Sequence, residues 1–271
     1  MINQGAADAA EEEGVNLVSV GPAFQGDLSS QLEVFENLVA QGAAAIAVAP
    51  VDSAGIAPAV NDAMGAGIPV VAIDTGVAGA EVTSFVATDN YAVAKVQGAV
   101  AATLVEDGQP IIYVTGNQAQ STGQERRNGF VESFSAARPN SEILEVPTEW
   151  NSQEAQEGVE AILNSRQDVA MVANAWDGGT MGAKAALENL GFSAGDVKLV
   201  GFDGAGDAIA AMDEGWVHAN TAQMLYQMGY QGIKAASAAA RGEDVSARID
   251  TGFFLVTPMT SGTYKAMVGI E

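Results

Sequence analysis

Short apolar runs alternate with amphipathic stretches along almost the whole chain. Each run has the composition of a buried strand, and the stretches between them repeat their apolar residues at helical spacing. Leu28, Leu32, Phe35 and Val39, for example, fall on one face of a helix that Asp27 can cap. Strands that alternate with helices predict βαβ units, right-handed crossovers and parallel sheets.

The predicted elements fall into two similar series, which indicates two doubly wound α/β lobes. We expect the first lobe to comprise residues 1–88 and 224–251, and the second to comprise 89–223 and 252–271. The predicted strands are 15–20, 45–48, 68–73, 84–87, 110–115, 143–147, 169–173, 198–202, 216–222 and 253–256. The predicted helices are 5–13, 27–42, 53–66, 90–106, 122–137, 178–190, 208–214 and 225–241, with a further helix that opens at Asn151.

Charge and composition restrict the classes of function that the chain can have. The chain has 271 residues, of which 34 are acidic and 11 basic, so its formal net charge is −23. Such a surface repels phosphate backbones, which argues against nucleic acid as a partner. The acidity itself fits solubility, in a salty habitat for instance, or a specific cationic partner. Apolar residues make up 48%, enough for ordinary cores.

The sequence offers little material for catalysis, metals or cofactors. It has no cysteine, and its one histidine, His218, lies in an alternating apolar stretch typical of a satisfied strand residue. Gly204-Ala205-Gly206 lacks the third glycine of a dinucleotide fingerprint, so we interpret it as a tight turn. We therefore predict no enzyme, no metal and no cofactor.

Membrane and export signals are also missing from the pattern. No apolar run approaches the roughly 20 residues of a membrane span. The segment Met1–Glu13 has neither a basic region nor an apolar core, so we predict that it is not a signal peptide.

In doubly wound sheets, ligands bind beyond the carboxyl ends of the strands. Asp74 and Asp203 each end an apolar strand, where an aspartate can cap a helix, accept hydrogen bonds from a ligand or act as an acid or base. Trp150 and Trp176 each follow a strand and suit either the face of a sugar ring or a core. Arg126 stands near the predicted start of a helix, where a cation opposes the dipole unless a carboxylate or ligand favours it; a solvated surface arginine is the alternative.

Several motifs together resemble the periplasmic sugar-binding proteins of the ribose-binding type, in that family's order and across nearly the whole chain. They are Val48-Ala49-Pro50-Val51-Asp52-Ser53, Gly67-Ile68-Pro69-Val70-Val71-Ala72-Ile73-Asp74, Ala87-Thr88-Asp89-Asn90, Glu125-Arg126-x-x-Gly129-Phe130, Val200-Gly201-Phe202-Asp203-Gly204 and Thr221-Ala222-Gln223. The resemblance implies a periplasmic-binding-protein-like type I fold, two lobes joined by a hinge, and a sugar or polyol bound between them. It also implies a receptor for the membrane permease of an ABC importer, in the periplasm or at the cell surface, recognised by the permease or by a chemoreceptor and monomeric at full length.

The resemblance also assigns roles to residues. Asp74, Arg126, Asp203 and Gln223 match the family's sugar hydrogen-bonding positions, and Trp150 matches an aromatic residue that stacks on the ring. With the neighbouring strand-end residues, the predicted ligand-binding set is Asp74, Thr75, Thr88, Arg126, Trp150, Trp176, Asp203 and Gln223.

Some positions depart from the family's pattern. Ala49 and Trp176 stand where ribose binders have asparagines, and Thr75 stands where they have an arginine. Polar groups are lost and apolar area is gained, so we expect a less polar or differently shaped sugar, a sugar alcohol or a cyclic polyol instead of ribose. Family members also begin with a strand before the helix at Gly5–Glu13, so we expect the first sheet to lack a central strand.

A second class of function shares the fold. The effector-binding domain of a sugar-responsive transcription regulator would have the same two lobes, with a helix-turn-helix upstream. The net charge of −23 opposes the approach of such a protein to DNA.

Overall fold

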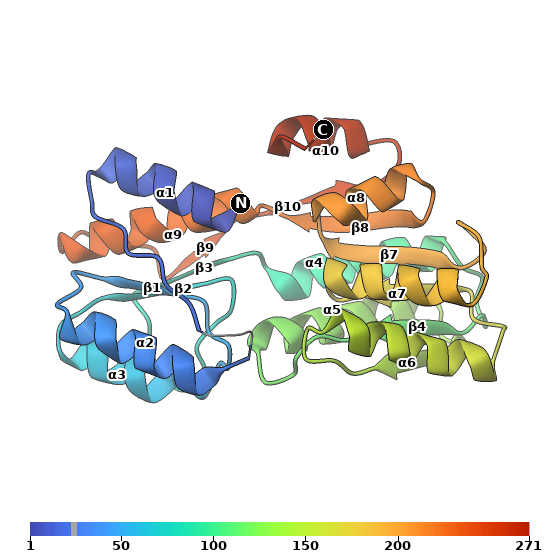
Figure 1. Cartoon of the computed structure of the whole chain (residues 1–271), viewed down its shortest axis with the longest axis horizontal. Helices are drawn as coiled ribbons and strands as arrows, with labels where there is room; N and C mark the ends of the chain where they lie inside the picture. The colour runs from blue at the N-terminus through green and yellow to red at the C-terminus, as the bar shows by residue number, and fades with distance from the viewer. Residues whose placement is uncertain (23–25, 271) are drawn as a thin grey trace. The chain divides into compact units, whose positions relative to one another are not determined.

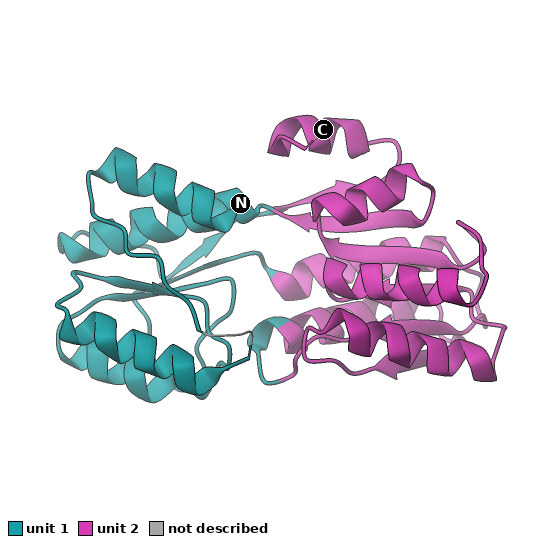
Figure 2. Cartoon of the chain, in the orientation of Figure 1, with its two compact units in different colours: residues 1–89, 119–122, 224–252 teal, residues 90–118, 123–223, 253–271 magenta. Residues whose placement is uncertain are grey.

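The computed structural model describes residues 1–22 and 26–270, and its strands and helices alternate along the chain (Figure 1). The chain divides into two compact units (Figure 2). Unit 1 comprises Met1–Asp89, Ala119–Thr122 and Met224–Gly252; unit 2 comprises Asn90–Gln118, Gly123–Gln223 and Phe253–Glu271.

Unit 1 contains a parallel four-stranded sheet in the order β1-β2-β3-β9. Helices pack on both of its faces, so β2 is apolar on both: Val70 packs in a core with Phe35 and Val60, and Val71 packs against Ala236. The strands are β1 (Ile46–Val48), β2 (Val70–Ile73), β3 (Ser84–Ala87) and β9 (Arg248–Asp250). The helices are α1 (Ile2–Glu13), α2 (Leu28–Ala40), α3 (Ala57–Gly65) and α9 (Leu225–Ala240).

Helices α1 and α9 lie side by side (Figure 1). Their backbones approach so closely that a Cβ atom added to Gly229 would lie 2.0 Å from the carbonyl oxygen of Ile2. Tyr226 donates a hydrogen bond to Asp8 across the same contact, at 2.8 Å. A glycine on α9 is therefore required for α1 to pack there.

Unit 2 contains a six-stranded sheet in the order β10-β8-β7-β6-β4-β5, in which only the edge strand β10 is antiparallel. The chain leaves β4 in one direction, toward β5, and then returns to build β6, β7 and β8 on the other side, so β4 and β6 flank a topological switch point. The strands are β4 (Ile111–Val114), β5 (Ile143–Val146), β6 (Met171–Asn174), β7 (Lys198–Asp203), β8 (Val217–Gln223) and β10 (Phe253–Val256). The helices are α4 (Asn90–Thr103), α5 (Ser121–Ala137, whose first two residues belong to unit 1), α6 (Ser152–Ser165), α7 (Asp177–Asn189), α8 (Gly206–Asp213) and α10 (Ser261–Val268).

The predicted α/β class, with two mainly parallel sheets, is confirmed. The predicted strand at 15–20 is wrong: Val15–Val20 forms no ladder with any described strand, and without a ladder an extended apolar segment is not a strand. The pattern missed β9 and α10, which are short and mixed in polarity. No described helix is long and apolar enough to cross a membrane.

The predicted helix caps have mixed outcomes. Asp27 accepts a hydrogen bond from the Ser30 backbone, and Asn151 accepts from the first turn of α6, as predicted. The capping box predicted at Thr122 is wrong, because α5 already begins at Ser121 and the Thr122 hydroxyl bonds to Thr75 instead.

Candidate ligand-binding site

Backbone strain is concentrated at three predicted ligand-binding residues. Among the residues that the structure describes, the only ones other than glycine with a positive φ are Asp74 (62°), Trp150 (59°) and Asp203 (109°). Such conformations cost roughly 1–3 kcal/mol each and persist only where the surrounding structure holds them. Asp74 directly follows β2, and Asp203 is the last residue of β7. Strain of this kind clusters at functional sites, so each unit has a candidate site at the carboxyl end of its sheet.

In unit 1, hydroxyl groups hold the half-buried side chain of Asp74. The Thr75 hydroxyl lies 2.9 Å from Oδ2 of Asp74 and 2.8 Å from the hydroxyl of Thr122. The Asp74 N–H donates to the Val86 carbonyl at 3.0 Å, which continues the pairing of β2 with β3. Thr75 itself is buried, with 2% of its surface exposed. The cluster therefore fixes the Asp74 carboxylate while Thr75 lies behind it.

Thr88 occupies a different part of unit 1. It follows β3, is fully buried, and lies beside the end of β9, where its hydroxyl is 3.4 Å from the Gly252 carbonyl. Arg248 donates to the Thr88 carbonyl at 3.0 Å. The contacts of Thr88 thus join β3 to the segment that follows β9.

In unit 2, Arg126 is the centre of a buried polar cluster. It is 3% exposed, and its Nε donates to Asn90 at 2.8 Å. Its Nη1 donates to the Ala175 carbonyl at 2.7 Å and to Oδ1 of Asp203 at 3.0 Å. The guanidinium also lies over the ring of Phe202, 4.0 Å from its centroid. Three acceptors and an aromatic face therefore fix its plane.

This position corrects the expectation for Arg126. Helix α5 begins at Ser121, so Arg126 lies in its second turn and not at the helix start. The effect of the helix dipole falls off within the first turn, so the dipole of α5 does not disfavour the charge of Arg126. The Asp203 carboxylate compensates for the burial of the guanidinium, and the alternative of a solvated surface arginine is wrong.

Trp150 and Trp176 lie against each other in unit 2. Their ring centroids are 5.2 Å apart at an interplanar angle of 84°, and the Arg126 guanidinium lies 5.8 Å from the Trp150 ring. Trp176 is buried, and Trp150 is half-buried. The Trp150 indole rests directly on Gly116, where an added Cβ atom would lie 1.9 Å from ring atoms. The missing side chain at Gly116 therefore makes room for the indole.

Gln223 ends β8 beside Asp203. Its Nε2 donates to Oδ1 of Asp203 at 2.7 Å, the same oxygen that accepts from Arg126. The side chain is 3% exposed, and its Oε1 has no hydrogen-bond partner among the described residues. A buried acceptor without a donor is unfavourable, which is typical of a group that a ligand hydroxyl or a water completes.

Sequence reasoning missed two residues that support this cluster. Asn90, at the start of α4, orients Arg126; its place in the motif Ala87-Thr88-Asp89-Asn90 was the only signal. Asp177, at the start of α7, is 2% exposed and accepts from the Ala205 N–H at 2.7 Å and from Asn220 at 2.6 Å. Burial raises the pKa of Asp177 well above its usual range, and the nearby Asp203 carboxylate raises it further.

The expectation for His218 is confirmed. It lies half-buried in β8, with Nδ1 3.0 Å from the Trp216 carbonyl. Burial lowers the pKa of the imidazole. Within residues 1–22 and 26–270, no group of three His, Cys, Asp or Glu side chains is placed to hold a metal ion.

Two α/β units, each with at least one strained residue and with oriented polar groups beyond its strands, define a class of protein that binds a small solute. Residues 1–244 match the family model described as "Periplasmic binding protein domain". The chain is 30% identical over 255 residues to the ribose import binding protein of Escherichia coli (strain K12), covering 94% of this chain and 84% of that protein. Our chain therefore belongs to the periplasmic sugar-binding proteins of the ribose-binding type.

Solved structures agree with this assignment. An ABC transporter solute-binding protein from Agrobacterium vitis with bound D-fucose superimposes with a TM-score of 0.91 at 27% identity, covering 98% of this chain and 93% of that one. Another, from Mycobacterium smegmatis with bound glycerol, gives a TM-score of 0.89 at 29% identity, covering 97% and 90%. The family consists of binding proteins, so the chain is a solute-binding protein and not an enzyme.

Proposed function

We propose that this protein is the solute receptor of an ABC importer and that it binds a sugar, a sugar alcohol or a cyclic polyol. The main support is the coincidence of backbone strain with predicted ligand contacts at Asp74, Trp150 and Asp203. The relatives described above bind polyhydroxylated solutes, and the residues gathered here are hydrogen-bonding partners for hydroxyl groups.

The cluster in unit 2 would orient the solute. The exposed part of the Trp150 indole offers a flat apolar surface for the C–H face of a ring. Oε1 of Gln223 would accept a hydroxyl hydrogen and so gain the donor it lacks. Arg126 would contribute through its guanidinium, whose plane Asn90 and Asp203 already fix, so little conformational entropy is lost on binding.

The carboxylate of Asp74 in unit 1 would accept from other hydroxyls of the same solute. Thr75 is buried behind that carboxylate, so we assign it the role of holding Asp74 instead of touching the solute. Thr88 is hydrogen-bonded to the segment after β9, so we assign it the role of holding that segment in place. A solute held by residues of both units favours a closed state, which the permease or a chemoreceptor would then recognise.

The solute is expected to be less polar than ribose or to differ from it in shape. Two indoles in edge-to-face contact enlarge the apolar part of the cluster. The side chain of Ala49 forms no hydrogen bonds and that of Trp176 can only donate one, whereas the side chain of an asparagine both donates and accepts. A 6-deoxyhexose, a sugar alcohol or a cyclic polyol fits this balance better than a pentose with all its hydroxyls bonded. Such a receptor works in the periplasm or at the cell surface.

A thermal-shift screen tests the proposal, with pentoses, hexoses, 6-deoxyhexoses, inositols and glycerol as probes. A solute at 100 times its dissociation constant stabilises the folded chain by about 2.7 kcal/mol. At roughly 2–4 °C per kcal/mol, the melting temperature should rise by about 5–10 °C. Product analysis of the bound solute is the control. The proposal is wrong if no polyhydroxylated probe shifts the melting temperature, or if the probe that does is chemically converted.

A further inference from the structure

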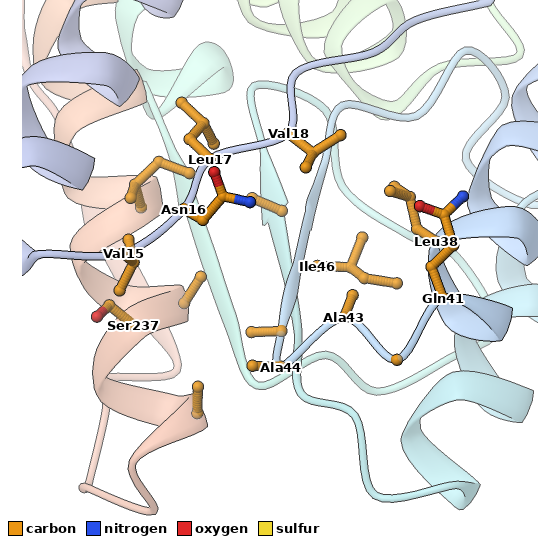
Figure 3. A pocket seen from close by; sticks show the side chains of 16 residues that line it. Val15, Asn16, Leu17, Val18, Leu38, Gln41, Ala43, Ala44, Ile46 and Ser237 are labelled. Atoms are coloured by element: carbon orange, nitrogen blue, oxygen red, sulfur yellow. The ribbon is translucent and has the colours of Figure 1, made fainter.

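The two units differ in the ionisable groups that they bury. A cavity of about 430 Å³ in unit 1 is lined by apolar and uncharged polar side chains, with no acid or base among the described residues around it (Figure 3). In unit 2, by contrast, the carboxyl group of Asp177 is buried at the first residue of α7. A buried carboxyl group needs either a cation or a proton to compensate for its lost hydration.

No cation compensates for the burial of Asp177. The guanidinium of Arg126 is paired with Asp203 at 3.0 Å, and no ion pair joins Asp177 to any arginine, lysine or histidine that the structure describes. The titratable groups around Asp177 come from β7, α8 and α10, and they are Asp203, Asp207 and Tyr264. Helix α6 faces the same turn of α7 with the uncharged Ser152. A negative charge on Asp177 would therefore meet the repulsion of two neighbouring acids.

The contacts of Asp177 suit a neutral carboxyl group. Its Oδ2 accepts from the Ala205 N–H at 2.7 Å, and its Oδ1 lies 2.6 Å from the side-chain amide of Asn220. Asn220 is fully buried, and its Oδ1 has no hydrogen-bond partner among the described residues. The two ends of an asparagine amide have nearly the same shape, so a turned amide would place this oxygen where a carboxyl O–H at Asp177 can donate to it. A separation of 2.6 Å is typical of an O–H···O bond, for which roughly 2.5–3.0 Å is usual.

Asp177 also holds the turn that carries Asp203. Its donor Ala205 follows Asp203 and Gly204, whose φ angles are 109° and 79°. Tyr264 donates to the Gly204 carbonyl at 2.9 Å on the same turn. A strained conformation such as that of Asp203 persists only while its surroundings hold it. The direction of the Asp203 carboxylate therefore depends on the hydrogen bond between Ala205 and Asp177.

We propose that Asp177 is a positioning residue that holds a proton at neutral pH. As a neutral acid it accepts from Ala205 and donates to Asn220, and the turn held in this way directs the Asp203 carboxylate. The part of Asp203 in contacting a solute is taken from the proposed function, on which this inference rests. A bound solute removes the Asp203 carboxylate from water and so strengthens its repulsion of a charge on Asp177.

This coupling gives the pH dependence of binding a definite sign. Solute binding favours the protonated form of Asp177, so the affinity falls as pH rises through the range in which Asp177 releases its proton. Proton loss from Asp74 or Asp203 has the opposite effect, because each carboxylate would accept hydrogen bonds from the solute.

The first test needs no solute. The infrared difference spectrum between the free wild-type chain and Asp177→Asn at neutral pH should contain the carbonyl band of a protonated carboxyl group. Asp196→Asn is the matched control, because Asp196 is an exposed aspartate of unit 2 and should give only the bands of an ionised carboxylate. If the Asp177 difference lacks the protonated band, the proposal is wrong, whatever the protein binds.

The second test separates the hydrogen bonds of Asp177 from its proton. Calorimetry measures binding of D-ribose, D-fucose, myo-inositol and glycerol to each variant over a range of pH. Asp177→Asn keeps an acceptor for Ala205 and a donor for Asn220, so at acidic pH it should bind within about threefold of wild type. Asp177→Leu keeps the volume without these bonds and should bind at least about tenfold more weakly.

The pH profiles complete this test. Wild-type affinity should fall by up to about tenfold per pH unit where Asp177 releases its proton, and Asp177→Asn should lack this fall. Equal losses in Asp177→Asn and Asp177→Leu would overturn the proposal, as would identical pH profiles of wild type and Asp177→Asn. If wild type binds none of the four probes, the proposed function fails, while the infrared spectrum still decides whether Asp177 holds a proton.

Discussion

Arg126→Ala should destabilise unit 2 and weaken solute binding together. The substitution removes three hydrogen bonds and leaves Oδ1 of Asp203 without its cation, near the buried carboxylate of Asp177. Removing one member of a fully buried pair costs about 3–5 kcal/mol. The side chain of Asp203 is 24% exposed, so solvent screens part of that loss. We expect a decrease of roughly 2–3 kcal/mol in the free energy of unfolding.

Arg127→Ala is the matched control, since it removes the same side chain from the next position of α5. The Arg127 guanidinium donates twice to Glu145, each at 2.6 Å, but the two side chains are 36% and 33% exposed. Exposed pairs contribute about 0–1 kcal/mol, so this variant should differ little from wild type. Arg126→Lys should recover only part of the loss, because one ammonium group cannot reproduce the planar contacts to Asn90, Ala175 and Asp203.

Urea unfolding followed by tryptophan fluorescence reports on unit 2, which contains Arg126, because all three tryptophans belong to that unit: Trp150, Trp176 and Trp216. Calorimetric titration with the solute found by the thermal-shift screen measures the second effect, an expected loss of about 2–5 kcal/mol in binding. The reasoning fails if Arg126→Ala unfolds within about 0.5 kcal/mol of Arg127→Ala, the size typical of a neutral surface change.

Three further predictions concern the neighbouring residues. Trp150→Ala should weaken solute binding by about 2–4 kcal/mol in calorimetry, with wild-type fluorescence changing on binding; unchanged affinity in a folded variant would make Trp150 a packing residue. Gly116→Ala should displace the Trp150 indole and lower affinity by at least about tenfold, whereas Gly65→Ala, which meets no atom within 4 Å in α3, should leave affinity intact; equal affinities would contradict the placement of the indole. Because the folded pKa of Asp177 is raised, its contribution to stability is full below the unfolded pKa near 3.8 and is lost as pH rises toward the folded pKa. Asp177→Asn should therefore show a flatter rise in stability on acidification from pH 7 to pH 4 in urea unfolding than wild type does, and identical pH profiles would argue against a buried titrating group.

The sequence by itself determined the order of most elements and the chemistry of the strand ends. Strands such as β4 and β2, buried on both faces, need continuous apolar runs, and such runs are visible in a single sequence. Helix caps at Asp27 and Asn151 were also predictable, because a cap depends on residues within one turn. Asp74, Trp150, Asp203 and Gln223 could be proposed because the ends of parallel strands are where ligands bind, whereas Arg126 was proposed from its motif and the family resemblance.

Only the tertiary structure decided how these side chains are used. The contacts of Arg126 with Asn90, Ala175 and Asp203 join residues far apart in the chain, so no local pattern specifies them. The same holds for Thr122, whose hydroxyl bonds to Thr75 instead of capping its own helix.

The segment Val15–Val20 shows most directly that composition alone does not determine a strand. Its composition is that of a strand, but a strand exists only when a neighbouring backbone completes its hydrogen bonds, and none of the described strands pairs with it. In the opposite sense, β9 has little apolar character of its own and is a strand because Arg248–Asp250 pairs with β3. Propensity is a property of the residues, whereas pairing depends on what the rest of the chain places next to them.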